Sequence, residues 1–435
     1  MNVASTVDQT TERNAYPTGI LLPMSRLIVF LGCAWVLAYY LLPNTLWGHS
    51  SPLSRLTDLS GGCTSFVSVL AVVGSSLGVW FLYLPFAKSQ RQTLALWLVT
   101  GCWLVAIMIS ALQLNKDAEI ANAGLSILAA LTIGMLAARL IGRPDLAAWL
   151  LVTLAAGQAI YALGYQHEHI HSMVIGTIER QRGTFAGQNA ISTIMVLSLP
   201  FAIGNLIKEN DSPLLFPSVV LTAAIVIALS MTWSPVSVLA FGAGLTWLLW
   251  RHTGRLVPTI LTAMSLVLVA GYVWNAAKPS QVATASIHTT SVEVLPNLSH
   301  GMTVFTANPT AGLGVGALRV NVHDSLNVNA AKANVINLEP GNVPLQWLDE
   351  MGIAGGLLFL LFVATISQCV RSAGSNLSYS LGASWLALLT LGMLRTPFGT
   401  ISTLHGTVIV GLLLGTTMLT NREIVAKVPL ESVGS

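Results

Sequence analysis

Apolar runs follow one another along the chain, and shorter polar breaks separate them. A helix of about 20 apolar residues is long enough to cross a bilayer. The pattern predicts twelve such helices, near residues 24–43, 65–87, 93–114, 120–141, 145–165, 189–207, 213–232, 234–250, 256–277, 350–370, 377–395 and 400–420. The break at Trp233–Pro235 separates the seventh span from the eighth. The expected fold is therefore an all-α, polytopic membrane bundle.

Two of the polar segments between the apolar runs are much longer than the others. They lie at about 166–188 and 278–349. The larger one lies between spans nine and ten and keeps apolar residues such as Val304 and Phe305, so we expect it to fold against the bundle. The predicted layout is a cytoplasmic tail at 1–23, nine spans over 24–277 including the first loop, the large periplasmic loop at 278–349, three spans over 350–420, and a second cytoplasmic tail at 421–435.

Composition supports lipid as the solvent of this chain. Hydrophobic residues make up 54% of it and charged residues 9%, against about 25% charged in soluble proteins. With the N-terminus in the cytoplasm, the inner connections carry twelve Lys and Arg residues and the outer ones eight, as the positive-inside rule favours. The net charge of +3 and the lack of a basic tract argue against nucleic acid as a partner.

Metal chemistry has little support in the sequence. The four cysteines are far apart, and three of them lie inside apolar runs, so neither a disulfide framework nor a zinc site is expected. The tract His167–His171 matches the HExxH pattern of zinc proteases, but no third ligand accompanies it. We therefore expect no metal and no other cofactor, and keep a membrane zinc protease as a minor alternative.

The first polar loop ends in the sequence RQRGTFAGQN, from Arg180 to Asn189, directly before an apolar run. Gly183 allows a tight turn next to the two arginines, and Asn189 is a good N-cap for the following helix. Arginines above a helix N-terminus would form an anion site, although Arg180 and Arg182 could also contact lipid headgroups only.

Two further tracts belong to the large loop. Gly312-Leu313-Gly314-Val315-Gly316 lacks the strand and helix of a dinucleotide motif, so its glycines are expected to form a tight loop beside the membrane. The tract from Glu339 to Gly352 leads into the tenth span. In it, Asp349 and Glu350 suit a helix dipole and Trp347 suits the membrane interface, which leaves Glu339 and Asn342 without a structural explanation.

In order and spacing, these features resemble the O-antigen ligase/polymerase superfamily of bacterial lipid-linked glycan polymerases and ligases. The shared features are a dozen spans, an outer Arg-x-x-Gly-Thr-Phe-x-x-x-Asn before a middle helix, the glycine-rich tract, and Asn-x-x-Leu-Gln-x-x-x-Glu-x-Gly at the end of a large outer loop. The last pattern is made here by Asn342, Leu345, Gln346, Glu350 and Gly352. The resemblance covers the second half of the chain well and the first half only by topology.

The resemblance implies glycosyl transfer on the periplasmic face of the bacterial inner membrane, from a glycan on undecaprenyl diphosphate to a sugar hydroxyl. The diphosphate leaving group would be stabilised by arginines, with Arg180 first, then Arg182, Arg319 and Arg395. Glu339 or His323 would take the proton of the acceptor hydroxyl.

The resemblance further gives Asn189, Asn342 and Gln346 as residues that position the loop and the acceptor. Besides the lipid-linked donor, the glycan acceptor and membrane lipid, the partners could include a chain-length regulator.

Family ligases usually carry His directly before the Asn of the closing pattern, where this chain has Gly341. They also often carry Ser-Arg-Gly where this chain reads Ser234-Pro235-Val236. Glu339 near Asn342 is closer to the form of exopolysaccharide polymerases. The sequence therefore favours a polymerase of O-antigen or exopolysaccharide repeats over the alternative, an O-antigen ligase that transfers glycan to lipid A core. A multispan transporter is disfavoured because the spans carry almost no charge.

Overall fold

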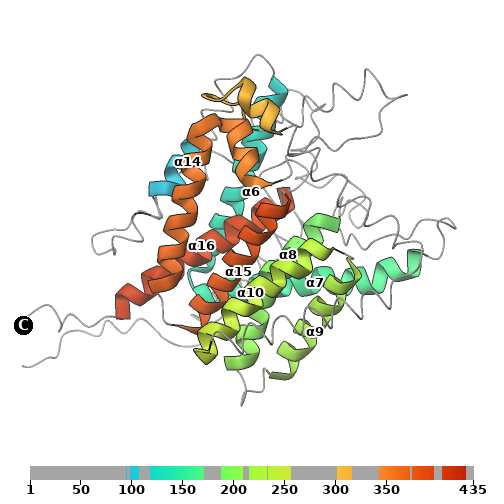
Figure 1. Ribbon diagram of the computed structural model, residues 1–435. Coiled ribbons are helices and arrows are strands. Elements are labelled where there is room, and N and C mark those ends of the chain that lie inside the picture. The colour runs from blue at the N-terminus through green and yellow to red at the C-terminus, as the bar shows by residue number, and fades with distance from the viewer. Residues whose placement is uncertain are drawn as a thin grey trace, which may run out of the picture.

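The fold is given by a computed structural model (Figure 1). It describes residues 95, 98–106, 118–170, 188–208, 215–232, 234–255, 301–315, 342–372, 375–395 and 404–427. Within these ranges the regular structure is helical and contains no strand, which confirms the all-α prediction for this part of the chain. The predicted spans near 24–43, 65–87 and 256–277 lie outside the described residues.

Eight long helices coincide with predicted spans. They are α6 (Ala118–Ile141), α7 (Pro144–Ile170), α8 (Gln188–Lys208), α9 (Leu215–Met231), α10 (Pro235–Thr253), α14 (Val343–Ser372), α15 (Asn376–Leu394) and α16 (Leu404–Lys427). Residues 98–106, within the predicted span 93–114, are helical as well. The break between α9 and α10 is confirmed: Ser234 caps α10, and its hydroxyl accepts a hydrogen bond from Ser237 N at 3.4 Å.

The described helices fit a membrane protein. Three of them contain segments long and apolar enough to span a bilayer: Pro144–Gly164, Val343–Val370 and Asn376–Leu394. Four shorter apolar helices lie at Ala130–Ile141, Ile191–Ile207, Leu215–Ser230 and Gly406–Thr420. Large apolar side chains also point outward, for example Phe216 on α9, which is 77% exposed, and Leu360 on α14, which is 64% exposed. Lipid would solvate such surfaces. The total of twelve spans remains a prediction.

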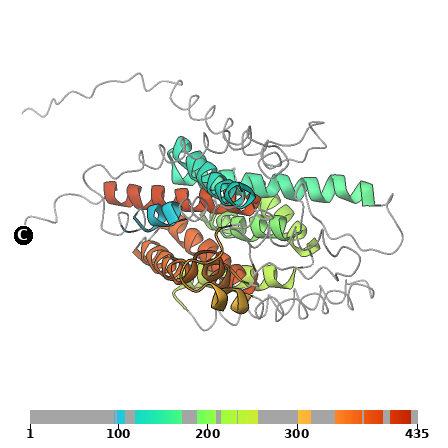
Figure 2. The ribbon, with the colours of Figure 1, turned by 90° about the horizontal axis from the view of Figure 1, so that it is seen from above.

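Glycines allow the closest helix contacts in the bundle. On α6, Gly134 faces the backbone of α16 at Val408, and Gly411 of α16 faces the backbone of α6 at Leu131. A side chain at either glycine would collide with the partner helix, so the two backbones approach as closely as small residues permit. Figure 2 shows α6 lying against α16, although residues 142–403 separate the two helices in the sequence.

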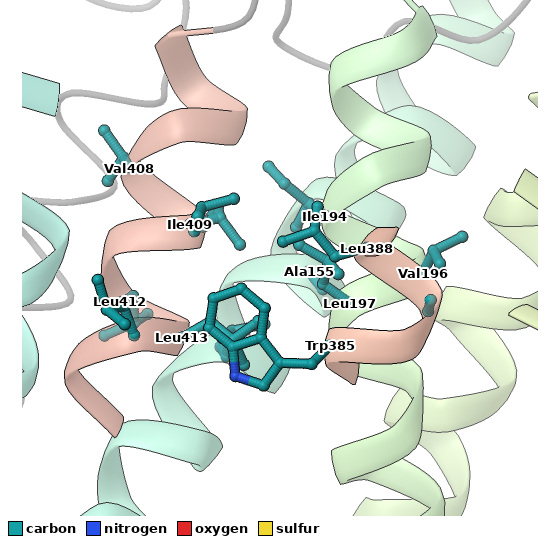
Figure 3. Packing of buried hydrophobic residues seen from close by; sticks show 14 of the residues in the cluster. Ala155, Ile194, Val196, Leu197, Trp385, Leu388, Val408, Ile409, Leu412 and Leu413 are labelled. Carbon is teal, nitrogen blue, oxygen red and sulfur yellow. The ribbon is translucent and has the colours of Figure 1, made fainter. Parts of the chain in front are cut away.

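The centre of the bundle is formed around α15, which packs against α8, α10, α14 and α16. Trp385 of α15 lies among aliphatic side chains of α8 and α16 (Figure 3). Its indole N–H donates to Thr417 Oγ1 at 2.9 Å, so the polar end of this buried ring is satisfied. The adjacent Ser384 Oγ donates to the Leu197 carbonyl at 2.8 Å and ties α15 to α8.

One helix, α14, is sharply bent at Gly352, whose φ of 65° and ψ of −158° are not helical. In Figure 1 the two orange limbs of α14 meet at the end of the bundle beside residues 301–315. The second limb, residues 353–372, corresponds to the predicted tenth span and is about 30 Å long at the α-helical rise. The first limb, Val343 to Met351, lies largely in the segment assigned to the large loop (278–349), so α14 begins before the predicted tenth span. Residues 301–307 of the same predicted loop are also helical.

Candidate functional site

The glycine-rich tract and the bend of α14 form one backbone junction. Leu313 N donates to the Asp349 carbonyl at 2.8 Å, and Gly314 N donates to the Glu350 carbonyl at 2.9 Å. In the reverse direction, Ile353 N donates to the Pro309 carbonyl at 2.9 Å. These bonds satisfy backbone groups that the break in α14 releases. Two patterns that the resemblance singled out are thus in direct contact.

Glycine is required on both sides of this junction. Gly312 and Gly314 have φ values of 68° and 100°, and Gly352 has a φ of 65°. A Cβ on Gly312 would lie 2.6 Å from Met351 N, and one on Gly352 would lie 2.6 Å from the Thr310 carbonyl carbon. The conformation and the close approach both exclude a side chain, which confirms the expectation of a tight glycine loop.

Asn342 begins the first limb of α14 and explains where it starts. Its Oδ1 accepts a hydrogen bond from Leu345 N at 2.8 Å, and its carbonyl accepts from Gln346 N at 3.0 Å. This is the geometry of an N-cap, and Pro344 follows in the first turn, where proline is tolerated. The structure therefore gives Asn342 a structural role that the sequence had left unexplained.

The aromatic residue of this limb is buried inside the bundle. Trp347 is 3% exposed and stacks on Trp103 with ring centroids 4.7 Å apart and planes 17° apart. Phe359 and Phe362 of the second limb also lie against it, with centroids 5.4 and 6.3 Å away. The placement of Trp347 at the membrane interface stays a prediction. The cluster holds the two limbs of α14 together and against the helical segment 98–106.

The acidic residues of the limb are differently placed than expected. Asp349 and Glu350 lie in the second turn of α14 or beyond, not in its first, and they are 0% and 4% exposed. A favourable helix dipole therefore does not explain them, since that effect is confined to the first turn. Gln346, which is 0% exposed, donates from Nε2 to Glu350 Oε2 at 3.4 Å. Neither carboxylate oxygen of Asp349 has a hydrogen-bond partner.

Arg395 is the one predicted diphosphate ligand within the described residues, and it joins three helices. It follows α15 directly, and its backbone N–H donates to the Leu391 carbonyl at 2.8 Å. Its Nη2 donates to Ser192 Oγ at 3.0 Å and to Thr193 Oγ1 at 3.1 Å, both on α8, and its Nη1 donates to Ser234 Oγ at 3.4 Å. Arginine keeps its charge in proteins, so hydroxyls of α8 and α10 contact a half-buried cation here.

Arg395 and the first limb of α14 belong to the same end of the bundle. Gly392, in the last turn of α15, faces Val343, and a Cβ on it would lie 3.3 Å from Val343 Cγ2. Ser192 and Thr193 lie in the second turn of α8, a few residues after the RQRGTFAGQN tract. The closing pattern, the glycine loop, Arg395 and the start of α8 are therefore brought together from distant parts of the sequence.

The other predicted site residues divide into two groups. Arg180, Arg182, Arg319, His323 and Glu339 lie outside the described residues. Asn189 is the second described residue of α8, which begins by Gln188, so it is inside the helix rather than the cap in front of it.

The HExxH tract coincides with a helix end. Helix α7 continues to Ile170, several residues beyond the predicted start of the loop at 166, and contains His167, Glu168 and His169. His171 lies outside the described residues. Within the described part of the chain, no group of three His, Cys, Asp or Glu residues is placed to hold a metal ion.

Sequence reasoning missed Asp349 as a candidate, together with the hydroxyl partners of Arg395. The helix dipole was the expected explanation of Asp349, and its position in the second turn of α14 together with its burial removes that explanation. The partners of Arg395 are ordinary Ser and Thr residues, which no pattern distinguishes. Their role depends entirely on how α8, α10 and α15 pack.

Comparisons with known proteins do not place the chain. No protein-family model matches it, and no curated protein matches it either. Membership of the O-antigen ligase/polymerase superfamily therefore remains a prediction that rests on the residues and on their arrangement.

Proposed function

We propose that the chain is an inner-membrane glycosyltransferase that polymerises undecaprenyl-diphosphate-linked oligosaccharide repeats on the periplasmic side during O-antigen or exopolysaccharide synthesis. The supporting observation is the convergence of the motif segments at one end of the bundle. The glycine loop is bonded to the closing pattern at 349–353, and Arg395 emerges beside it, against the start of α8.

The chemistry requires a cation that is held in place before the reaction. The donor leaves as a lipid diphosphate, and negative charge develops on its phosphate oxygens as the glycosidic bond breaks. Arg395 suits this task because hydrogen bonds to hydroxyls of α8 and α10 fix the position of its guanidinium. Arg180, Arg182 and Arg319 would add further positive charge, and a groove between helices would hold the lipid tail.

The test is the surface polysaccharide of a strain that lacks this chain, complemented with wild-type protein, Arg395→Ala, Arg395→Lys or Arg143→Ala. Arg143 is an exposed arginine in the short α6–α7 connection and serves as the control. The deletion should lose long polymer and keep single-repeat material. Arg143→Ala should restore the polymer and Arg395→Ala should not. Arg395→Lys should restore little, because lysine lacks the planar fork that reaches several hydroxyls.

The same gel separates the alternatives. Polymer that accumulates on the carrier lipid without reaching its acceptor would identify a ligase. An unchanged polysaccharide pattern in the deletion strain would contradict both glycan functions and favour transport. Membrane abundance of each variant has to be measured in parallel, since Arg395 also connects three helices.

A further inference from the structure

Asp349 is the one buried carboxylate of the junction with no role in the fold described above. It is 0% exposed, and neither Oδ1 nor Oδ2 has a hydrogen-bond partner. Burial of a polar group without a partner is unfavourable, and native structures keep few such groups. Its neighbour Glu350 differs, because Gln346 donates to its carboxylate.

Among the described residues, the segment that lies against Asp349, residues 301–315, supplies no compensating charge. Gly301 lies against the carboxylate, and a Cβ on this glycine would lie 2.9 Å from Asp349 Oδ2. Residues 301–315 contain no titratable side chain. On the helix of Asp349 itself, Glu350 is the adjacent ionisable group and has the same sign. Among the described residues, the carboxylate lies against Gly301, and its two oxygens make no hydrogen bond that would compete with uptake of a proton.

We propose that Asp349 is a catalytic residue of the transfer reaction, the general base that accepts the proton of the acceptor hydroxyl. This inference rests on the proposed function. It also answers a question raised by the sequence, since the usual ligase histidine is replaced by Gly341. Asp349 lies two helical turns after that position, on a limb whose start is fixed by the Asn342 cap.

The proposed step balances as a displacement at the anomeric carbon of the donor. The acceptor oxygen forms a bond to this carbon while its proton moves to an Asp349 carboxylate oxygen. The bond between the anomeric carbon and the phosphate oxygen breaks, and the diphosphate departs with the electron pair. Arg395 faces the developing charge, and the Asp349 proton then passes to water.

Access to Asp349 requires residues 301–307 to move away from α14. The backbone hydrogen bonds that join this region to α14 are donated or accepted by residues 309, 313 and 314, whereas Gly301 contacts Leu345 and Asp349 by packing. The outer side of the short helix is exposed at Met302, Thr303 and Thr306. We expect residues 301–307 to lift while the glycine junction stays bonded.

The experiment measures steady-state rates of the purified full-length chain with lipid-linked repeat extracted from the deletion strain, from acidic to alkaline pH. Asp349→Asn keeps the shape of the side chain and removes the base. It should lower kcat by about 10²–10⁴-fold with little change in the KM for the donor. Asp145→Asn, a carboxylate in the first turn of α7, is the matched control and should keep the wild-type rate.

Asp349→Glu protects the test against a variant that fails to fold. It keeps a carboxylate and should retain partial activity, with the acidic limb of its pH–rate profile displaced from that of the wild type. A wild-type rate in Asp349→Asn, or an undisplaced profile in Asp349→Glu, would overturn the role of Asp349 alone. A wild-type chain that does not consume the lipid-linked repeat would instead overturn the proposed function.

Discussion

At the scale of single residues, the junction depends on three glycines that the sequence had marked for different reasons. Gly312 and Gly314 were expected in a tight loop, and Gly352 was noted only as the end of the closing pattern. In the structure the segment around Gly312 and Gly314 contacts the segment around Gly352, and all three glycines have positive φ. Spacing could predict a loop at 312–316, but the collision of Gly352 with Thr310 depends on tertiary packing.

Replacement of Gly352 by alanine should disrupt this junction. Its φ of 65° and ψ of −158° fall in a region that is essentially restricted to glycine, and strain of this kind amounts to about 1–3 kcal/mol. We expect Gly352→Ala to lower the unfolding midpoint of the purified chain in detergent and to reduce polymer synthesis.

Gly157→Ala is the matched control. Gly157 is an exposed glycine inside α7 with nothing within 4 Å of an added Cβ. Alanine there should stabilise the helix by about 0.5–1 kcal/mol. Equal stability and activity of Gly352→Ala and the wild type would show that the bend does not hold the junction together.

At the scale of helices, hydrophobic runs predict where the helices are. The ends of the helices are harder to predict where polar residues belong to them. The signals at Ser234 and Pro235 place the boundary between α9 and α10 correctly. The first limb of α14 lies largely in the predicted large loop, which was placed at residues 278–349. Asn342 followed by Pro344 was the available sign of a helix start. The polar residues of this limb are buried by contacts with other segments, and the residue pattern of one helix does not predict such contacts.

The aromatic cluster around Trp347 should hold the two limbs of α14 in their bent arrangement. Trp347 stacks on Trp103 and contacts two phenylalanines of the second limb. Trp347→Ala should reduce stability by about 3–5 kcal/mol, seen as a large drop in the unfolding midpoint. Trp347→Phe, which keeps an aromatic ring, should lose less.

A suitable control for this cluster is Leu357→Ala on the second limb. Leu357 is 57% exposed on an outward face and should tolerate truncation. If Trp347→Ala unfolds at the same temperature as Leu357→Ala, the cluster does not stabilise the bend.

At the scale of the whole molecule, the sequence predicts which segments are helices but not which of them meet. Glycines bring α6 against α16, and Arg395 joins α15 to α8 and α10 through hydroxyls. These contacts gather the closing pattern, the glycine loop and a half-buried arginine at one end of the bundle. These segments are close in space because of how the helices pack. The sequence pattern predicts only the order of the segments along the chain.

The most direct test of the polymerase proposal is reconstitution of the purified full-length chain with labelled undecaprenyl-diphosphate-linked repeat. We predict a ladder of products that carry increasing numbers of repeats and remain on the carrier lipid, with undecaprenyl diphosphate released at each addition. Arg395→Ala should abolish the ladder, and Arg143→Ala should leave it intact. Unchanged single-repeat donor after incubation with wild-type protein, under conditions where its fold is retained, would contradict the assignment.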